Sequence, residues 1–103
     1  MKLDKEEFMQ TCLGKNMKRC VQIWDYIISQ TEKASGYEYR DLLAKEDLCS
    51  AEWNAYKIAM YQFYGIGCEF DRTDEYYGII TIDTVDGTTD WLFKTYRDKG
   101  EIR

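Results

Sequence analysis

Hydrophobic positions recur every three or four residues over the first two thirds of the chain and every second residue beyond Gly65. The first spacing is typical of a helix with one buried face, and the second is typical of a half-buried β-strand. We therefore predict helices over about 4–13, 17–33, 39–46 and 51–64, and strands over about 66–71, 76–85 and 88–97. The predicted fold is α+β, with four N-terminal helices followed by a three-stranded antiparallel β-meander.

Local signals set the expected limits of these elements. Asp4 begins a capping-box pattern at the first helix, and Gly14 is expected to end that helix. Ser50 is expected to cap the last helix, after a turn through residues 47–49. Asp86-Gly87 is a strong hairpin signal between the last two strands.

The 103 residues suit a single domain with one modest core. We expect bulky apolar side chains on the predicted helices to form its centre: Trp24, Ile28, Leu42, Trp53, Met60 and Phe63. Asp25 falls with the polar residues of the second helix, opposite its apolar face.

The order of elements over residues 17–97 resembles the winged helix-turn-helix superfamily. The likeness is carried by the segment from Tyr39-Arg-Asp-Leu-Leu through Ser50-Ala-Glu-Trp-Asn. It implies that the helix beginning at Ser50 enters the DNA major groove while the hairpin touches the phosphate backbone. The nucleic-acid-facing stripe would then consist of Asn54, Lys57 and Tyr61. A DNA-binding transcriptional regulator is accordingly the alternative function.

The distribution of charge favours a different function. The chain carries a formal net charge of −5, and the segment 69–90 holds seven acidic residues with Arg72 as its one base. Carboxylates in a wing would repel phosphates, whereas they attract a basic protein surface. The chain also has nine tyrosines, a residue type that supplies contact area in protein interfaces. The predicted partner-binding residues are Glu69, Asp71, Asp74, Glu75, Tyr76 and Tyr77, and the alternative interpretation is that these acids only keep the sheet soluble.

In size, charge and composition the chain is similar to small acidic phage-encoded inhibitors of host defence, anti-CRISPR proteins among them. That likeness implies a protein that docks on a basic surface of a host nucleic-acid-processing or defence complex. The leading hypothesis is therefore a non-enzymatic protein-binding module.

Histidine is absent, which removes the commonest general acid-base group, and no catalytic residue, cofactor or metal is expected. The segment 82–91 resembles the Asp-Pro-Ile-Asp-Gly-Thr motif of the inositol monophosphatase family, with Thr84 where that family has proline. This resemblance implies Asp83 and Asp86 as magnesium ligands and Thr88 as an aid to the attacking water. A magnesium-dependent phosphatase is the third hypothesis.

The four cysteines are widely spaced without a Cys-x-x-Cys pair, and we expect them to be reduced and metal-free. No apolar run reaches the roughly 18 residues of a membrane span, and the N-terminus lacks a signal-peptide core. These features predict a cytoplasmic protein without a membrane partner.

Overall fold

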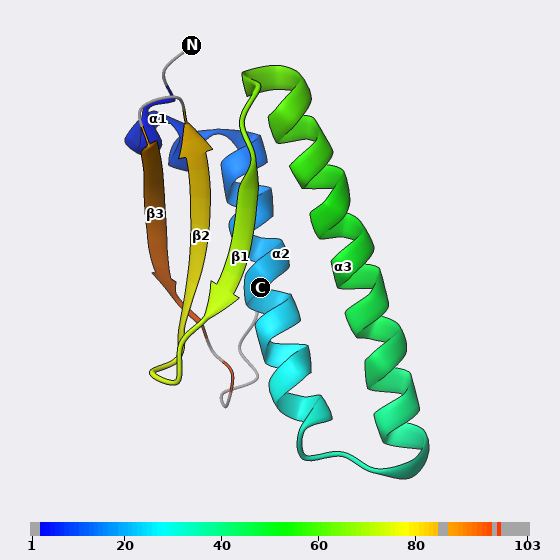
Figure 1. Cartoon of the computed structure of the whole chain (residues 1–103). Helices are drawn as coiled ribbons and strands as arrows, with labels where there is room; N and C mark the ends of the chain where they lie inside the picture. Colours follow the sequence, from blue (N-terminus) through cyan, green and yellow to red (C-terminus); the bar gives the residue numbers. More distant parts are fainter. Residues whose placement is uncertain (1–2, 85–86, 96, 98–103) are drawn as a thin grey trace.

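The computed structural model describes residues 3–84, 87–95 and 97 (Figure 1). Within these residues the helices are α1 (Lys5–Gln10), α2 (Cys12–Thr31) and α3 (Gly36–Tyr64). They precede the strands β1 (Cys68–Arg72), β2 (Tyr77–Thr84) and β3 (Gly87–Lys94), which form an antiparallel sheet in the order β1-β2-β3. The predicted α+β class and the three-stranded meander are confirmed, but the described part of the chain has three helices where four were predicted.

The first two helices are separated at Thr11 and not at Gly14. The Asp4 carboxylate accepts a hydrogen bond from the Glu7 N–H at 3.2 Å, as the capping pattern predicted. Thr11 caps α2 in the same way, its hydroxyl oxygen accepting from the Gly14 N–H at 3.0 Å. A side chain at Gly14 would overlap the Phe8 carbonyl oxygen, so this glycine allows close packing of α1 on α2 and does not end a helix.

A single unbroken helix, α3, occupies the region where two helices and a turn were predicted. It begins at Gly36 and ends before Gly65, and both glycines have a positive φ. No glycine or proline lies between them, so nothing in the sequence prevents the i to i−4 hydrogen bonds from continuing. The predicted turn at 47–49 and the cap at Ser50 are therefore wrong, and the helix-turn-helix break is absent.

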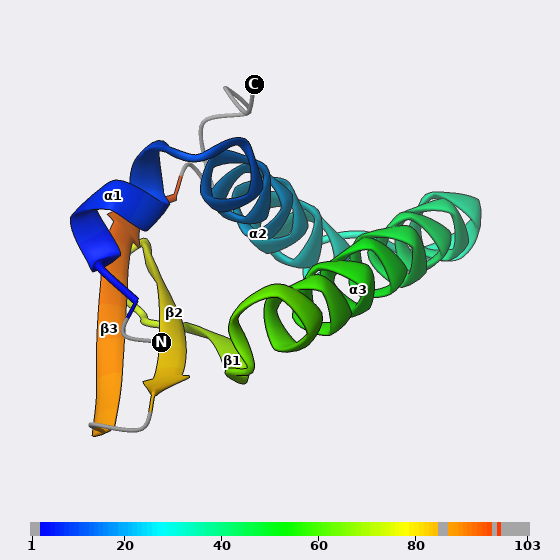
Figure 2. The ribbon, with the colours of Figure 1, turned by 90° about the horizontal axis from the view of Figure 1, so that it is seen from above.

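The helices cover one face of the sheet (Figure 2). Helices α2 and α3 lie side by side as an antiparallel pair, and α3 reaches the sheet mainly at β1. Most of the described core lies between α2, the C-terminal half of α3 and the inner face of the sheet, and includes Phe8, Met17, Val21, Met60, Ile80, Ile82, Trp91 and Phe93. No helix in the described part of the chain has the length and apolar character needed to cross a membrane.

The predicted core is correct in part. Trp53 and Met60 are buried, and Trp24 is half-buried with its ring centroid 5.7 Å from that of Phe70. Ile28 and Leu42 are also only half-buried. Phe63 is 71% exposed near the C-terminal end of α3 and so is not part of the core.

Candidate protein-binding surface

The outer face of the sheet is left uncovered by the helices (Figures 1 and 2). Alternate residues of each strand point to opposite faces, and the buried positions of β1, β2 and β3 identify the inner one. The remaining positions form an outer surface that we call the acidic sheet face. Its residues are Glu69, Asp71, Tyr77, Ile79, Thr81, Asp83, Thr88, Asp90, Leu92 and Lys94.

An apolar pair lies at the middle of the acidic sheet face. Ile79 is directly opposite Leu92, which is 58% exposed, and Asp71 is opposite Ile79 on the other side. In the next row the Thr81 hydroxyl donates to a carboxylate oxygen of Asp90 at 2.9 Å, which holds that carboxylate on the same face. An apolar centre with a charged border is the arrangement of many protein interfaces.

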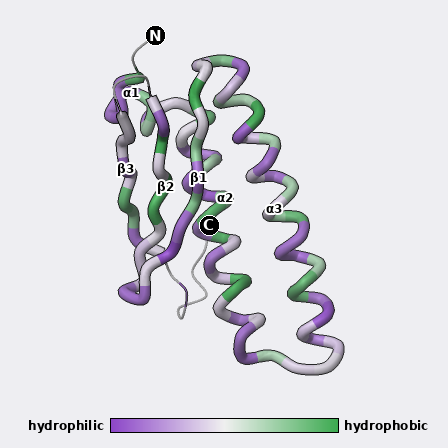
Figure 3. The backbone as a smooth tube through the Cα atoms, viewed as in Figure 1, coloured by the Kyte–Doolittle hydropathy of each residue, from purple (hydrophilic) through white to green (hydrophobic). Residues whose placement is uncertain are grey.

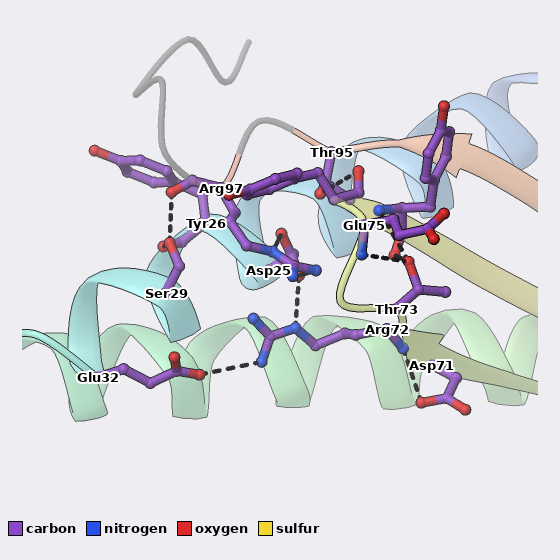
Figure 4. A network of polar contacts seen from close by, with 12 residues as sticks. Asp25, Tyr26, Ser29, Glu32, Asp71, Arg72, Thr73, Glu75, Thr95 and Arg97 are labelled. Carbon is purple, nitrogen blue, oxygen red and sulfur yellow. Dashed lines mark hydrogen bonds and ion pairs between the residues drawn. The ribbon is translucent and has the colours of Figure 1, made fainter.

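The single base of the acidic segment is turned away from this face. Arg72 is an inner-face residue, and its Nε donates to Asp25 Oδ1 at 2.6 Å (Figure 4). Arg97 donates to both oxygens of Asp25, at 2.9 Å to Oδ1 and 3.2 Å to Oδ2. Glu32 lies 3.6 Å from Arg72 Nη1 at the edge of the network. The charge of Arg72 is thus compensated by the buried Asp25, and Arg72 does not neutralise the outward carboxylates. Glu69 is the one among them that pairs with Lys57 of α3.

Asp25 is completely buried, which contradicts its predicted place on a solvated helix face. It lies four residues from Val21 and from Ser29, and all three are buried along one side of α2. The Ser29 hydroxyl donates to the Arg97 carbonyl oxygen at 2.6 Å, so the chain after β3 is fastened to α2 beside Asp25. The four-residue spacing of positions 21, 25 and 29 indicates one buried side of the helix, but the polarity of Asp25 and Ser29 favoured a solvated side instead.

The turn between β1 and β2 holds Tyr76 in a left-handed conformation, with φ of 67°. Such a φ is uncommon for a bulky residue and marks a site that its surroundings hold in place. Here Thr95 donates to the Tyr76 carbonyl oxygen from both its N–H (2.8 Å) and its hydroxyl (2.9 Å). The Arg97 guanidinium lies 5.3 Å from the centre of the Tyr76 ring, which is still 46% exposed.

The structure brings all six predicted partner-binding residues together around the β1–β2 hairpin. Glu69, Asp71 and Tyr77 lie on the acidic sheet face, and all three are exposed. Asp74, Glu75 and Tyr76 are exposed in the turn that adjoins it. The apolar pair Ile79 and Leu92 was not predicted, although strict alternation along β2 and β3 would have placed it outward.

The other exposed tyrosines do not join this surface. Tyr37 and Tyr39 lie at the start of α3, and Tyr61 lies close to its end. At 1.5 Å per residue, Tyr37 and Tyr61 are roughly 36 Å apart along the helix axis. The acidic residues and these three tyrosines therefore do not form one continuous surface.

The predicted nucleic-acid-facing stripe lies on one side of the C-terminal half of α3. Asn54 and Tyr61 are exposed there, but Lys57 Nζ forms an ion pair with Glu69 Oε1 at 2.8 Å. This hydrogen bond raises the pKa of Lys57. Because α3 is continuous, the stripe has no helix N-terminus beside it to approach a phosphate.

The residues of the predicted magnesium site are divided between described and undescribed positions. Asp83 and Thr88 are opposite each other on the acidic sheet face, whereas Asp86 lies outside the described residues. Over 3–84, 87–95 and 97, no three or more His, Cys, Asp or Glu side chains gather in an arrangement that would hold a metal ion.

The four cysteines are free thiols in the structure. Cys20 and Cys68 are buried, Cys49 is half-buried and Cys12 is exposed. Burial raises the pKa of Cys68 to about 11 and that of Cys20 further still. Neutral, shielded thiols at these positions behave as small apolar groups.

No family model matches the chain, and no curated protein or solved structure matches it either.

Proposed function

We propose that the protein is a non-enzymatic binding module that docks its acidic sheet face and the adjoining turn on a basic surface of another protein. The observation that carries this proposal is the inward position of Arg72, bound to the buried Asp25. Arg72 therefore does not neutralise the exposed carboxylates of Asp71, Asp74 and Glu75, which lie near the half-buried Ile79 and the exposed Leu92. The carboxylates would steer the approach of the partner, and Ile79, Leu92 and Tyr77 would supply the contact that slows dissociation.

The partner class follows from the charge. Grooves that bind nucleic acid are lined with Lys and Arg that neutralise phosphates, and they attract carboxylates on a protein for the same reason. We propose a host nucleic-acid-processing or defence complex as the partner and an inhibitor of the phage-encoded, anti-CRISPR-like class as the role. In such a role the acidic sheet face competes with nucleic acid for one groove.

Charge reversal in the hairpin tests this function. The partner is captured from host cells on the immobilised wild-type protein, and its binding kinetics are then measured at several salt concentrations. Asp71→Lys, Asp74→Lys and Glu75→Lys together are expected to slow association about tenfold at low salt and to remove most of its salt dependence. Leu92→Ala is expected to speed dissociation, at a cost of about 1–2 kcal/mol in binding.

The matched control is Glu38→Lys, a reversal of an exposed acid at the distant start of α3, which should leave both rates unchanged. A DNA gel shift with the triple variant distinguishes a DNA-binding regulator from a protein-binding module. For a regulator, removing acids near phosphates would tighten DNA binding. Equal capture of the partner by the wild type and the triple variant, with equal rates, would reject the proposed surface.

A further inference from the structure

A second apolar surface lies on the side of α3 that faces away from the core. Figure 3 shows hydrophobic positions along the whole helix, yet Trp53 and Met60 are its only buried residues. Eight exposed positions on the outward side recur at alternating intervals of four and three residues, and we call them the α3 stripe. They are Tyr37, Asp41, Ala44, Leu48, Ala51, Ala55, Ile58 and Gln62.

This spacing is a heptad repeat, the pattern by which one helix packs along another. Leu48 is 71% exposed and Ile58 is 58% exposed, so the stripe includes large apolar side chains as well as alanines. No described element of the chain covers it, since α2 packs on the opposite side of α3 (Figure 2). The stripe extends over roughly 39 Å of helix at 1.5 Å per residue.

We propose that the α3 stripe binds the α3 stripe of a second copy of this chain, with the two helices antiparallel about a two-fold axis between residues 49 and 50. In this register Leu48 lies opposite Ala51 of the second copy, and Ala44 lies opposite Ala55. The four central layers are then entirely apolar, and each Leu48 meets a small residue that allows close approach. Asp41 and Tyr37 lie in the outer layers, opposite Ile58 and Gln62, where interfaces are more polar.

The charges beside the stripe select this register. Lys45 and Glu52 are exposed on the same side of the stripe. Antiparallel pairing places Lys45 of each copy beside Glu52 of the other copy. Two symmetry-related ion pairs result. A shift of one heptad in one direction would place Glu52 against Glu52, and a shift in the other would place Lys45 against Lys45. Like charges at these positions disfavour both shifts.

The same charges disfavour a parallel pair. In a parallel pair, the residue that directly precedes Asp41 or Leu48 of the stripe faces the residue five positions later in the second helix. Arg40 would then face Lys45, and Asp47 would face Glu52, which are two repulsive contacts on each side. Antiparallel pairing instead places Asp47 beside Asn54. Both orientation and register are therefore set by residues next to the apolar positions.

The proposed contact is independent of the acidic sheet face. The stripe lies on the side of α3 that faces away from α2, and the acidic face is the outer side of the sheet (Figure 2). The two surfaces approach each other where Lys57 pairs with Glu69, and the four central layers of the stripe, over residues 44–55, precede that point along α3. A dimer formed through α3 would leave both acidic faces free for a partner. A variant that no longer self-associates should therefore bind the protein partner with unchanged association and dissociation rates.

Sedimentation equilibrium of the full chain, from about 5 to 500 μM at low salt, tests the contact. The wild type is expected to approach the mass of two chains, and Leu48→Glu is expected to raise the dimer dissociation constant at least about tenfold by placing a charge in the central layers. Phe63→Glu is the matched control, because Phe63 is also 71% exposed on α3 but lies off the stripe. A wild type that remains monomeric throughout, or equal weakening by both variants, would overturn the proposal.

A charge exchange tests the register. Lys45→Glu and Glu52→Lys are each expected to weaken the dimer several-fold, because each leaves like charges facing one another. The double variant restores opposite charges and should recover the wild-type dissociation constant. Circular dichroism checks the helix content of each variant, because Glu52 also interacts within its own chain with Tyr56 and Cys20. The pKa values of both groups are raised mainly by burial and further by this carboxylate. A double variant as weak as the single ones would contradict the antiparallel register.

Discussion

At the scale of single residues, the most important charged group is the buried carboxylate of Asp25. Asp25 is fully buried and binds Arg72 and Arg97, which come from β1 and from the segment after β3. Among the described residues, every buried polar side-chain atom has a hydrogen-bond partner. A satisfied network of this kind joins α2 to β1 and to the chain after β3, and it directs Arg72 inward. The charge of the outer surface thus depends on a contact in the interior.

Asp25→Asn should destabilise the fold strongly. The amide keeps the size of the side chain but leaves two guanidinium groups, 26% and 13% exposed, without their counter-charge. Loss of one partner of a buried ion pair costs about 3 kcal/mol or more, measured as the free energy of unfolding in urea. Asp71→Asn, at an exposed position of β1, is the control and should change that free energy by less than about 0.5 kcal/mol. Similar small effects for both substitutions would contradict a structural role for Asp25.

At the scale of elements, the strands were more predictable than the helices. Alternation in residues 68–94 identifies faces as well as strands, and each predicted strand boundary was within a few residues of the observed one. In α3, by contrast, Asp47 and Ser50 are residues that favour caps, and their side chains gave a local signal for a helix start. The absence of glycine and proline from residues 37–64 was the stronger fact, because tertiary packing against α2 then supports one continuous helix.

Two alanine substitutions distinguish a helix interior from a helix start. Ser50→Ala should leave the free energy of unfolding unchanged or raise it by a few tenths of a kcal/mol, because alanine has the higher helix propensity. Thr11→Ala should lower it by about 1 kcal/mol, because Thr11 is the observed cap of α2. Urea unfolding of both variants measures the difference. A loss of about 1 kcal/mol from Ser50→Ala would indicate that a helix does begin there.

At the scale of the whole molecule, the fold places residues of the same type, or from the same segment, on different surfaces. The described acids of segment 69–90 fall on one sheet face and its turn, which composition and alternation largely predicted. The tyrosines are divided between that face and two separate parts of α3, which no local pattern could show. The inward position of Arg72 required the long-range contact with Asp25, 47 residues away. Periodicity along the sequence does not predict contacts between residues this far apart in the chain.

The resolved pKa shifts also have one direction across the molecule, and this predicts a loss of stability at alkaline pH. The pKa values of Cys20, Cys49, Cys68 and Tyr56 are raised mainly by burial, and that of Lys57 is raised by its bond to Glu69. The folded chain therefore retains protons that the unfolded chain loses. Stability falls with pH wherever the unfolded state binds fewer protons. These groups should therefore cause no decline between pH 7 and about pH 8, and a decline above the ordinary thiol value of 9.0.

For Cys68 this decline should continue up to the folded pKa of about 11. Urea unfolding at pH 7.5, 9, 10 and 10.5 measures it. Cys68→Ala removes one of the titrating groups and should make the decline shallower, even though the lost side chain lowers stability at every pH. Ile66→Val is the control, because it also removes buried volume but no ionisable group, and it should keep the wild-type pH dependence. The prediction fails if stability rises between pH 8 and 10.5, or if Cys68→Ala and Ile66→Val have the same pH profile. Parallel profiles would mean that the Cys68 thiol ionises as readily inside the fold as outside it.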